Sequence, residues 1–299
     1  GTYKVDPEIE IERPPMVEQK LREGIGRTLA KLERGEEVKV GFFGGSITAM
    51  LGWRGLILQK LRKDYPKANI VEVNASLGGA GSLAGAFRMQ HDILHAKCDL
   101  MILEYATNDS ENSPAQNLRS MEGCVRQAWR SKPDMDLLFV YTMNASQMEA
   151  YKKGCTSDTA FVHDVIADHY GIPTVNFCPR LIEGIRSGKW IYMMADYRRE
   201  NGLKVDDPDY KAKFEAAKKK DPRKIFTFDN CHPSGEGHQL YYEILADAFD
   251  ALKARKDKPA DHAAKMALKP LAADNMENAK LVFPNETIFS KGDWTILPK

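Results

Sequence analysis

The sequence has no long apolar run, and no stretch approaches the roughly 18 residues that a membrane-spanning helix needs. It also has no excess of charge, because 43 basic residues stand against 42 acidic ones and give a formal net charge of +1. Whole-chain charge therefore gives no reason to expect nucleic acid or an anionic membrane as a partner. The first residues lack the apolar stretch of a signal peptide, which a trimmed or mature chain would lack too.

Paired cysteines are absent as well. The five cysteines form no C-x-x-C pair and are scattered, at Cys98, Cys124, Cys155, Cys178 and Cys231. This argues against a structural zinc site or a thioredoxin-like redox site, and the odd number leaves at least one thiol unpaired within the chain. Cysteine usage therefore does not decide the compartment. An apolar share of 43% in 299 residues is that of an ordinary globular protein with a sizeable core.

Short apolar runs alternate with amphipathic stretches through the middle of the chain. This pattern predicts strands at 38–43, 69–73, 99–104, 136–142 and 172–177, and helices at 53–64, 82–96, 114–131, 157–170 and 234–254. Alternation at these lengths predicts an α/β fold with a mostly parallel sheet covered on both faces. Active sites in such sheets lie in the loops at the carboxyl ends of the strands.

Three segments depart from this alternation. Residues 1–37 are predicted to form an N-terminal helical extension, from apolar residues spaced by three and four at Val17, Leu21, Ile25, Leu29 and Leu32. Residues 196–224 hold 17 charged residues in 29 and predict a charged insertion within a domain at 38–255. It could be a solvated helical excursion, a flap over a substrate cleft or a contact for a polyanion. Residues 256–299 indicate a linker and a tail with strand-like pieces at 280–283 and 294–297.

A serine follows the first predicted strand directly, in Gly44-Gly45-Ser46. At such a tight turn the hydroxyl is exposed at the end of the strand, and the serine N–H can point into the same cleft. A serine hydroxyl is a poor nucleophile at neutral pH unless a base accepts its proton. Because Gly-Gly-Ser alone is also typical of an ordinary turn, Ser46 is a candidate nucleophile only in combination with other residues.

A candidate base comes late in the chain, where Asp229 and His232 precede the last predicted helix. Three residues apart on one turn, a carboxylate and an imidazole can pair, so that the acid fixes the tautomer of the ring and stabilises the imidazolium. The alternative is that Asp229 caps a turn and His232 is an ordinary surface residue.

Two further strand-end loops, at 74–82 and 106–109, offer hydrogen-bond donors. A glycine N–H from the first loop and the Asn108 amide from the second could complete an oxyanion hole with the N–H of Ser46. One such donor is typically worth roughly 2.7–4 kcal/mol of transition-state stabilisation. Both loops are also ordinary turn material. A phosphate-binding loop is a poor alternative, because residues 41–45 lack G-x-G-x-x-G spacing and no G-K-[ST] follows.

Taken together, these segments resemble the SGNH (GDSL-type) hydrolase family over roughly residues 38–254. The blocks that carry the resemblance are Gly44-Gly45-Ser46, the turn 74–82, Ala106-Thr107-Asn108-Asp109, and Asp229 with His232. The resemblance implies a flavodoxin-like three-layer sandwich. Aligned this way, the oxyanion glycine is Gly79, with Gly78 the second choice.

Two residues depart from the family pattern. Gly45 stands where the family usually has aspartate, and Ala106 replaces the usual glycine. Neither position supplies the nucleophile, the base or an oxyanion donor, so these departures concern the geometry of the loops.

The resemblance implies a serine-dependent ester hydrolase acting through an acyl-enzyme. Ser46 is then the nucleophile, His232 the base and Asp229 its orienting acid, while Gly79 and Asn108 join the Ser46 N–H in the oxyanion hole. The expected substrate is a short acyl ester, foremost O-acetyl on a carbohydrate, with no cofactor and no metal. Two alternatives remain open: a carbohydrate-binding protein with an inactive site, and an O-acyltransferase. Export to the periplasm or the exterior is expected, with the cytoplasm and the oligomeric state left open.

Other residues suit competing roles less well. His91 and His95, four residues apart, echo a zinc-binding H-E-x-x-H with Asp92 in place of glutamate, but the stretch is typical of a polar helix surface. Cys231 lies between the candidate acid and base and is an improbable nucleophile there. Three further histidines are expected to be structural or solvated: His163, His169 and His238. Candidates for lining a pocket, with burial in the core as the alternative, are Trp53, Arg54, Tyr105 and Trp190.

Overall fold

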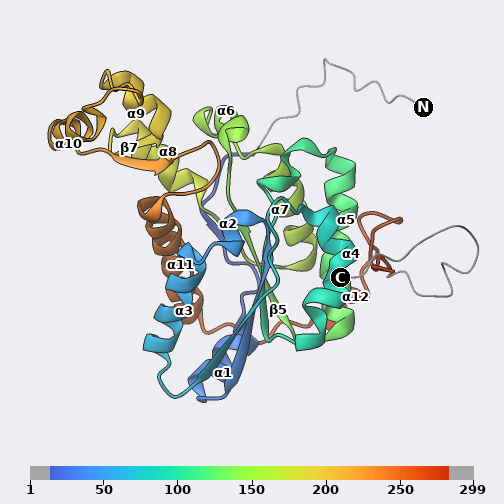
Figure 1. Cartoon of the computed structure of the whole chain (residues 1–299). Coiled ribbons are helices and arrows are strands. Elements are labelled where there is room, and N and C mark those ends of the chain that lie inside the picture. Colours follow the sequence, from blue (N-terminus) through green and yellow to red (C-terminus); the bar gives the residue numbers. More distant parts are fainter. Residues whose placement is uncertain (1–13, 283–299) are drawn as a thin grey trace, which may run out of the picture.

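The computed structural model describes residues 14–282 and has a six-stranded sheet between two layers of helices (Figure 1). The strand order is β1-β6-β5-β4-β2-β3, and every neighbouring pair is parallel except β1 with β6. The strands are β1 (Gln19–Lys20), β2 (Glu37–Gly44), β3 (Asn69–Asn74), β4 (Leu100–Glu104), β5 (Asp136–Tyr141) and β6 (Thr174–Asn176). The predicted α/β sandwich with a mostly parallel sheet is confirmed.

The helices cover both faces of the sheet. One face carries α1 (Gly26–Glu33), α3 (Gly52–Asp64), α8 (Cys178–Arg186) and α11 (Gly235–Arg255). The opposite face carries α4 (Ser82–Asp92), α5 (Pro114–Ser131) and α7 (Asp158–Tyr170). Figure 1 shows α3 and α11 on one side of the strands and α4, α5 and α7 on the other. Short helices complete the described chain: α2 (Ser46–Ala49), η1 (Leu94–Ala96), η2 (Asn108–Glu111), η3 (Ala145–Gln147), α6 (Met148–Lys152) and α12 (His262–Met266).

Local sequence explains where these elements form. Every residue of β4 and β5 is buried, as expected for central strands of a parallel sheet with helices on both faces. Ser113 accepts a hydrogen bond from the N–H of Gln116 at the start of α5, and Pro114 fits the first helical position. The predicted N-cap Ser234 accepts one from the N–H of Gly237 and so begins α11.

The helix predicted from Val17 to Leu32 is wrong in its first half. Residues 19–20 instead pair with β6 as the antiparallel edge strand β1, and α1 begins only at Gly26. Between them Gly24 adopts a φ of +72°, which favours glycine and interrupts a helix. The apolar spacing was compatible with a helix, but pairing with the edge of the sheet determined the structure.

The charged insertion is flanked by an unexpected second sheet. β7 (Trp190–Met193) pairs in parallel with β8 (Lys224–Thr227), and the two strands enclose α9 (Met194–Glu200) and α10 (Tyr210–Lys220). A small core joins these elements, formed by Ile191, Met194, Tyr197 and Ile225. No residue of α10 is fully buried, which agrees with the predicted solvated helix. The unit projects beyond the layer of α3 and α11 in Figure 1.

The segment after α11 lies along the outer surface of α5. The buried carboxylate of Glu122 accepts hydrogen bonds from the N–H groups of Leu271 and Ala272. Gly123 lets the chain approach closely, because a Cβ there would lie 2.6 Å from the carbonyl carbon of Met276. Residues 280–282 are not a strand, and the rest of the strand-like tail, Phe283 and 294–297, lies outside the described residues. Within residues 14–282, no helix is long and apolar enough to cross a membrane.

Candidate active site

Ser46 lies at the carboxyl edge of the sheet, where β2 ends and α2 begins. Gly45 before it has an ordinary extended backbone with a φ of −84°, so the turn does not need glycine for its conformation. As the first residue of α2, Ser46 has an N–H with no acceptor inside the helix. Both the hydroxyl and this N–H are therefore available at the end of the strand.

The structure brings Ser46, His232 and Asp229 into one hydrogen-bonded line. The Ser46 Oγ lies 2.7 Å from the His232 Nε2, and the His232 Nδ1 lies 2.8 Å from the Asp229 Oδ2. A carboxylate at Nδ1 keeps the proton on that nitrogen, which leaves Nε2 able to accept the serine proton. The turn 227–232 after β8 thus meets the turn after β2 across 186 residues of sequence.

Asp229 is strongly stabilised as a carboxylate. Its Oδ1 accepts hydrogen bonds from the backbone N–H groups of the next three residues, at 2.6, 2.7 and 2.8 Å. Thr227 donates a fourth from its hydroxyl at 3.0 Å. Partial burial opposes ionisation, but the bond from the His232 ring and these donors outweigh it and hold the pKa of Asp229 well below its usual range. The acid is therefore charged at any pH at which the histidine acts as a base.

The loops that carry the candidate oxyanion donors pack against the serine turn. In the loop after β3, the N–H of Ala80 donates to the carbonyl of Leu77 and closes a β-turn. Gly79 lies within this turn and has a φ of +76°. Gly78, the second choice, lies beside the serine: a Cβ there would be 3.8 Å from the Ser46 Cβ. The structure thus places Gly78 beside the nucleophile, whereas an added Cβ at Gly79 meets no atom within 4 Å.

Asn108 packs directly against the serine turn. A Cβ added to Gly45 would lie 1.9 Å from the Asn108 Oδ1, so the asparagine occupies the space where the family usually has a side chain. The Asn108 side chain faces Gly45 with its oxygen, so its amide nitrogen points away from Gly45. The departure at Gly45 is therefore accommodated by Asn108, while Ala106 is buried and its carbonyl accepts a hydrogen bond from Gln147 at 2.9 Å.

Asp109, which had no role in the sequence interpretation, anchors the glycine loop. It is fully buried, and its Oδ1 accepts a hydrogen bond from the N–H of Ser82 at 2.7 Å. Its Oδ2 lies 3.1 Å from the Nε2 of the buried His163, a residue expected to be structural. Gly81 is tight against this carboxylate, since a Cβ there would come within 2.4 Å. Only the Asn-Asp pair itself could have pointed to this contact.

The competing sites gain no support. His91 is exposed with its ring at Asp92, and the His95 ring lies 3.1 Å from the carbonyl of His91. Among residues 14–282, no three His, Cys, Asp or Glu side chains gather where they could hold a metal. Burial and the neighbouring Asp229 raise the pKa of the Cys231 thiol to about 11, which disfavours a thiolate nucleophile.

The aromatic candidates for a pocket divide into two kinds. Trp53 and Tyr105 are fully buried core residues, and Trp53 packs edge-on against Phe42 and Phe177. Arg54 is buried too and donates to the carbonyl of Thr48 at 2.9 Å. Trp190 alone among the four lines open space, in a cleft of about 410 Å³ between η3–α6 and β7–α9.

That cleft borders the acid turn. The N–H of Ala145 and the hydroxyl of Tyr192, which both line it, each donate to the carbonyl of Asn230 at 2.9 Å. Around the site, three exposed apolar side chains stand on three different loops: Leu51, Leu77 and Phe228, with 69, 49 and 64% of their surface accessible. The nucleophile thus has both an apolar rim and a polar cleft near it.

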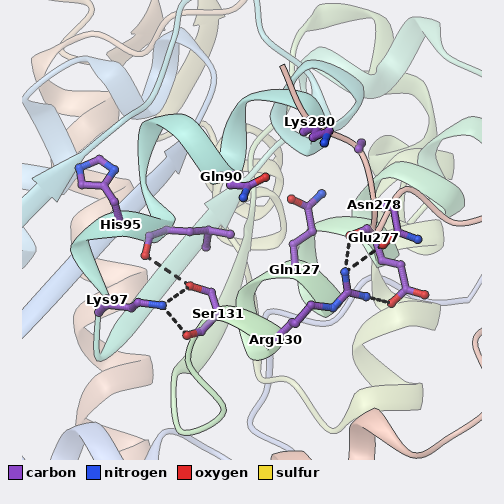
Figure 2. Close-up of a pocket in the computed structure, with 11 residues that line it drawn as sticks. Gln90, His95, Lys97, Gln127, Arg130, Ser131, Glu277, Asn278 and Lys280 are labelled. Atoms are coloured by element: carbon purple, nitrogen blue, oxygen red, sulfur yellow. Dashed lines mark hydrogen bonds and ion pairs between the residues drawn. The ribbon is translucent and has the colours of Figure 1, made fainter. Parts of the chain in front are cut away.

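A larger cavity, of about 670 Å³, lies away from these loops between α4, α5 and residues 277–280 (Figure 2). Two of its basic side chains are engaged: Lys97 donates to Ser131, and Arg130 donates to Glu277 and Asn278. Figure 2 shows these contacts on the outer face of the helix layer. Size therefore does not identify the reactive centre in this molecule.

The fold and this edge of the sheet define a three-layer α/β hydrolase of the SGNH class. A sequence model of the GDSL-like lipase/acylhydrolase family matches residues 42–240, well over half of the chain. The chain belongs to the GDSL-like lipase/acylhydrolase family. Membership in this family makes the chain a carboxylic ester hydrolase, the class expected from the sequence.

Solved structures with the same fold include a two-domain esterase (CEX) active on acetylated mannans. Its chain is 23% identical with a TM-score of 0.61, over 85% of this chain and 59% of that one. The same esterase co-crystallised with mannopentaose is 22% identical with a TM-score of 0.58, over 82% of this chain and 56% of that one. LAE5, an α/β hydrolase from the metagenome of Lake Arreo in Spain, is 14% identical with a TM-score of 0.51, over 72% of this chain and 96% of that one. The present chain spans less than two thirds of the two-domain esterase, and these identities show the fold alone. No curated protein sequence matches this chain.

Proposed function

We propose that this chain is a serine esterase that removes short acyl groups, foremost O-acetyl groups from carbohydrate, through an acyl-enzyme. The observation that carries the proposal is the contact of 2.7 Å between the Ser46 Oγ and the His232 Nε2, completed by Asp229. Nucleophile and base within hydrogen-bond reach, with the base oriented by a third group, is the signature of an activated serine.

The reaction follows from these positions. The Ser46 Oγ attacks the ester carbonyl while the His232 Nε2 takes the serine proton, and Asp229 stabilises the resulting imidazolium. The N–H groups of Ser46 and Gly79 and the amide of Asn108 donate to the oxyanion. Collapse breaks the carbon–oxygen bond to the alcohol, which receives the proton from His232. Water then attacks the acyl-enzyme in the same way and releases the acid.

A short acyl group suits the packing beneath the nucleophile. Ile47 and Thr48, which follow Ser46, are fully buried, and Glu104 fills the space below them. Buried side chains thus pack directly beneath the serine turn, which supports a short acyl group.

A carbohydrate alcohol suits the surroundings of the site. Sugar rings have apolar C–H faces and a polar edge. The loops around the site expose Leu51, Leu77 and Phe228, and a cleft with several polar side chains borders the acid turn. The acetylmannan esterase with the same fold supports this choice of substrate by analogy.

The first test is acetate release from an activated acetate ester and from acetylated manno-oligosaccharides. We expect Ser46→Ala and His232→Ala each to reduce kcat on the order of 10⁴–10⁶-fold, and the double variant to be little worse, because triad members act as a unit.

Other outcomes separate the alternatives. Multiplying losses in the double variant would contradict the shared role of the two residues. Glycan binding without any turnover indicates an inactive binding protein, and acetyl transfer to an added sugar acceptor indicates an O-acyltransferase.

A further inference from the structure

Glu104, the last residue of β4, is a fully buried carboxyl with no basic partner among the residues described in the structure. Burying such a group is costly unless hydrogen bonds compensate for the lost water. Two hydroxyls do so: Thr48 donates to Oε2 at 2.8 Å and Thr142 donates to Oε1 at 2.6 Å. The carboxyl thus lies where two side chains from different loops converge.

The chain of hydroxyls continues by one more step. The Oγ1 of Thr142 lies 2.6 Å from the Oγ1 of Thr107. When Glu104 is ionised and accepts the proton of Thr142, Thr107 is the donor in this pair. All four residues are buried. The result is a directed network in which Thr107 donates to Thr142, and both Thr142 and Thr48 donate to the carboxyl.

This network joins the two sides of the oxyanion hole. Thr48 belongs to α2, two residues after Ser46, while Thr107 directly precedes Asn108. α2 is only four residues long and has no side-chain cap, so it depends on outside contacts for its position. Gly44 makes room for one of them, because a Cβ there would lie 2.9 Å from the Thr48 Oγ1 and 2.6 Å from the Glu104 carbonyl oxygen.

We propose that Glu104 is a positioning residue that fixes the separation between the Ser46 N–H and the Asn108 amide through Thr48, Thr142 and Thr107. Oxyanion donors act only when they lie about 2.7–3.1 Å from the oxyanion, and a shift of about 1 Å is able to cost 10²-fold in rate. Glu104 touches neither the serine hydroxyl nor the substrate. The expected change in kcat rests on the proposed function. The expected change in the NMR signals of the site rests on the hydrogen-bond network alone.

The decisive variants are Thr48→Val, which keeps the shape of threonine but removes the hydroxyl, and Thr48→Ser, which keeps the hydroxyl but removes the methyl group. With an activated acetate ester we expect Thr48→Val to lower kcat about 10–10²-fold with KM within about twofold, while Thr48→Ser stays within about threefold of the wild type. Glu104→Gln, which has a single acceptor oxygen, should lower kcat in the same way.

A matched control removes a similar hydroxyl elsewhere. Thr28 is equally buried and donates to the carbonyl of Asp99 at 3.3 Å, at the amino-terminal edge of β4. Thr28→Val should lower the melting temperature to a similar degree and leave kcat unchanged. Equal kcat losses in Thr28→Val and Thr48→Val, or no rescue in Thr48→Ser, would overturn the proposal.

A second measurement does not depend on turnover. In ¹⁵N-labelled protein, Thr48→Val should shift the signals of the Ser46 N–H and of the Asn108 side-chain amide, and Thr28→Val should not. Unchanged signals would refute the positioning role even if the protein hydrolyses no ester. Conversely, shifted signals without Ser46-dependent hydrolysis would refute the proposed function and leave the network intact.

Discussion

Two carboxyl groups near Ser46, Asp229 in the turn after β8 and Glu104 at the end of β4, have opposite environments. Asp229 stands at the rim, where its bond to the His232 ring and three backbone N–H bonds outweigh partial burial and hold its pKa well below the usual range. Glu104 is fully buried and accepts two hydroxyl bonds. Burial outweighs these bonds and raises the pKa of Glu104 to about 7.

The difference shows that hydrogen-bond donors, more than distance from the serine, determine what each acid can do. A carboxyl that is charged throughout the working range is suited to stabilise an imidazolium. A carboxyl with a raised pKa and no cation near it is better suited to hold neighbouring loops in place. The turn that carries Asp229 is therefore suited to support proton transfer, and the buried network around Glu104 is suited to hold the loops of the site in position.

The largest effect should come from neutralising the rim acid. Asp229→Asn keeps the size of the side chain but removes the charge and favours the wrong tautomer of His232, so kcat should fall about 10⁴-fold. The measurement is kcat for an activated acetate ester across pH 6–9. A loss below about tenfold would show that Asp229 does not orient the base.

A smaller effect should come from filling the space above the buried network. Gly45→Ala introduces a Cβ that would lie 1.9 Å from the Asn108 Oδ1, so the asparagine must move out of place. We expect kcat to fall about 10²-fold, as for loss of one oxyanion donor. Gly235→Ala is the control, because no atom lies within 4 Å of its added Cβ. Equal activity in both variants would remove Asn108 from the oxyanion hole.

Sequence alone predicted the residues that meet at the sheet edge. Parallel strands end on one edge, so the turns after β2, β3 and β4 had to converge there, and the Asp-x-x-His spacing placed acid and base on one turn. The turn after β8 lies outside the six-stranded sheet, so its contact with Ser46 was expected from the family resemblance and not from this topology. Their catalytic roles, together with those of Gly79 and Asn108, stay predictions.

The buried network was beyond sequence reasoning. Thr48, Glu104 and Thr142 are far apart in the chain, and each is individually unremarkable at the end of a strand or in a short helix. The strands β7 and β8 were missed for a related reason: each has four residues, and their pairing depends on contacts across the insertion. At the N-terminus, pairing of β1 with β6 prevailed over a helical pattern.

The smallest expected effect concerns stability. Because burial raises the pKa of Glu104 from 4.5 to about 7, the folded state binds its proton more tightly than the unfolded state. This contribution to stability is complete below about pH 4.5 and is lost as pH rises through about 7. Relative to the wild type, Glu104→Gln should therefore gain about 2 kcal/mol in free energy of unfolding between pH 5 and pH 8, measured by urea denaturation.

Asp136 gives the reference for this test, because burial raises its pKa to about 6 at the opposite edge of the sheet. Relative to the wild type, Asp136→Asn should also gain free energy of unfolding as pH rises. This gain should be complete at a lower pH than the gain of Glu104→Gln. The two curves would separate by about one pH unit if burial alone sets both values. If the difference in free energy of unfolding between Glu104→Gln and the wild type does not change with pH, Glu104 is ionised throughout, as Asp229 is. The two acids near Ser46 would then differ in exposure but not in protonation.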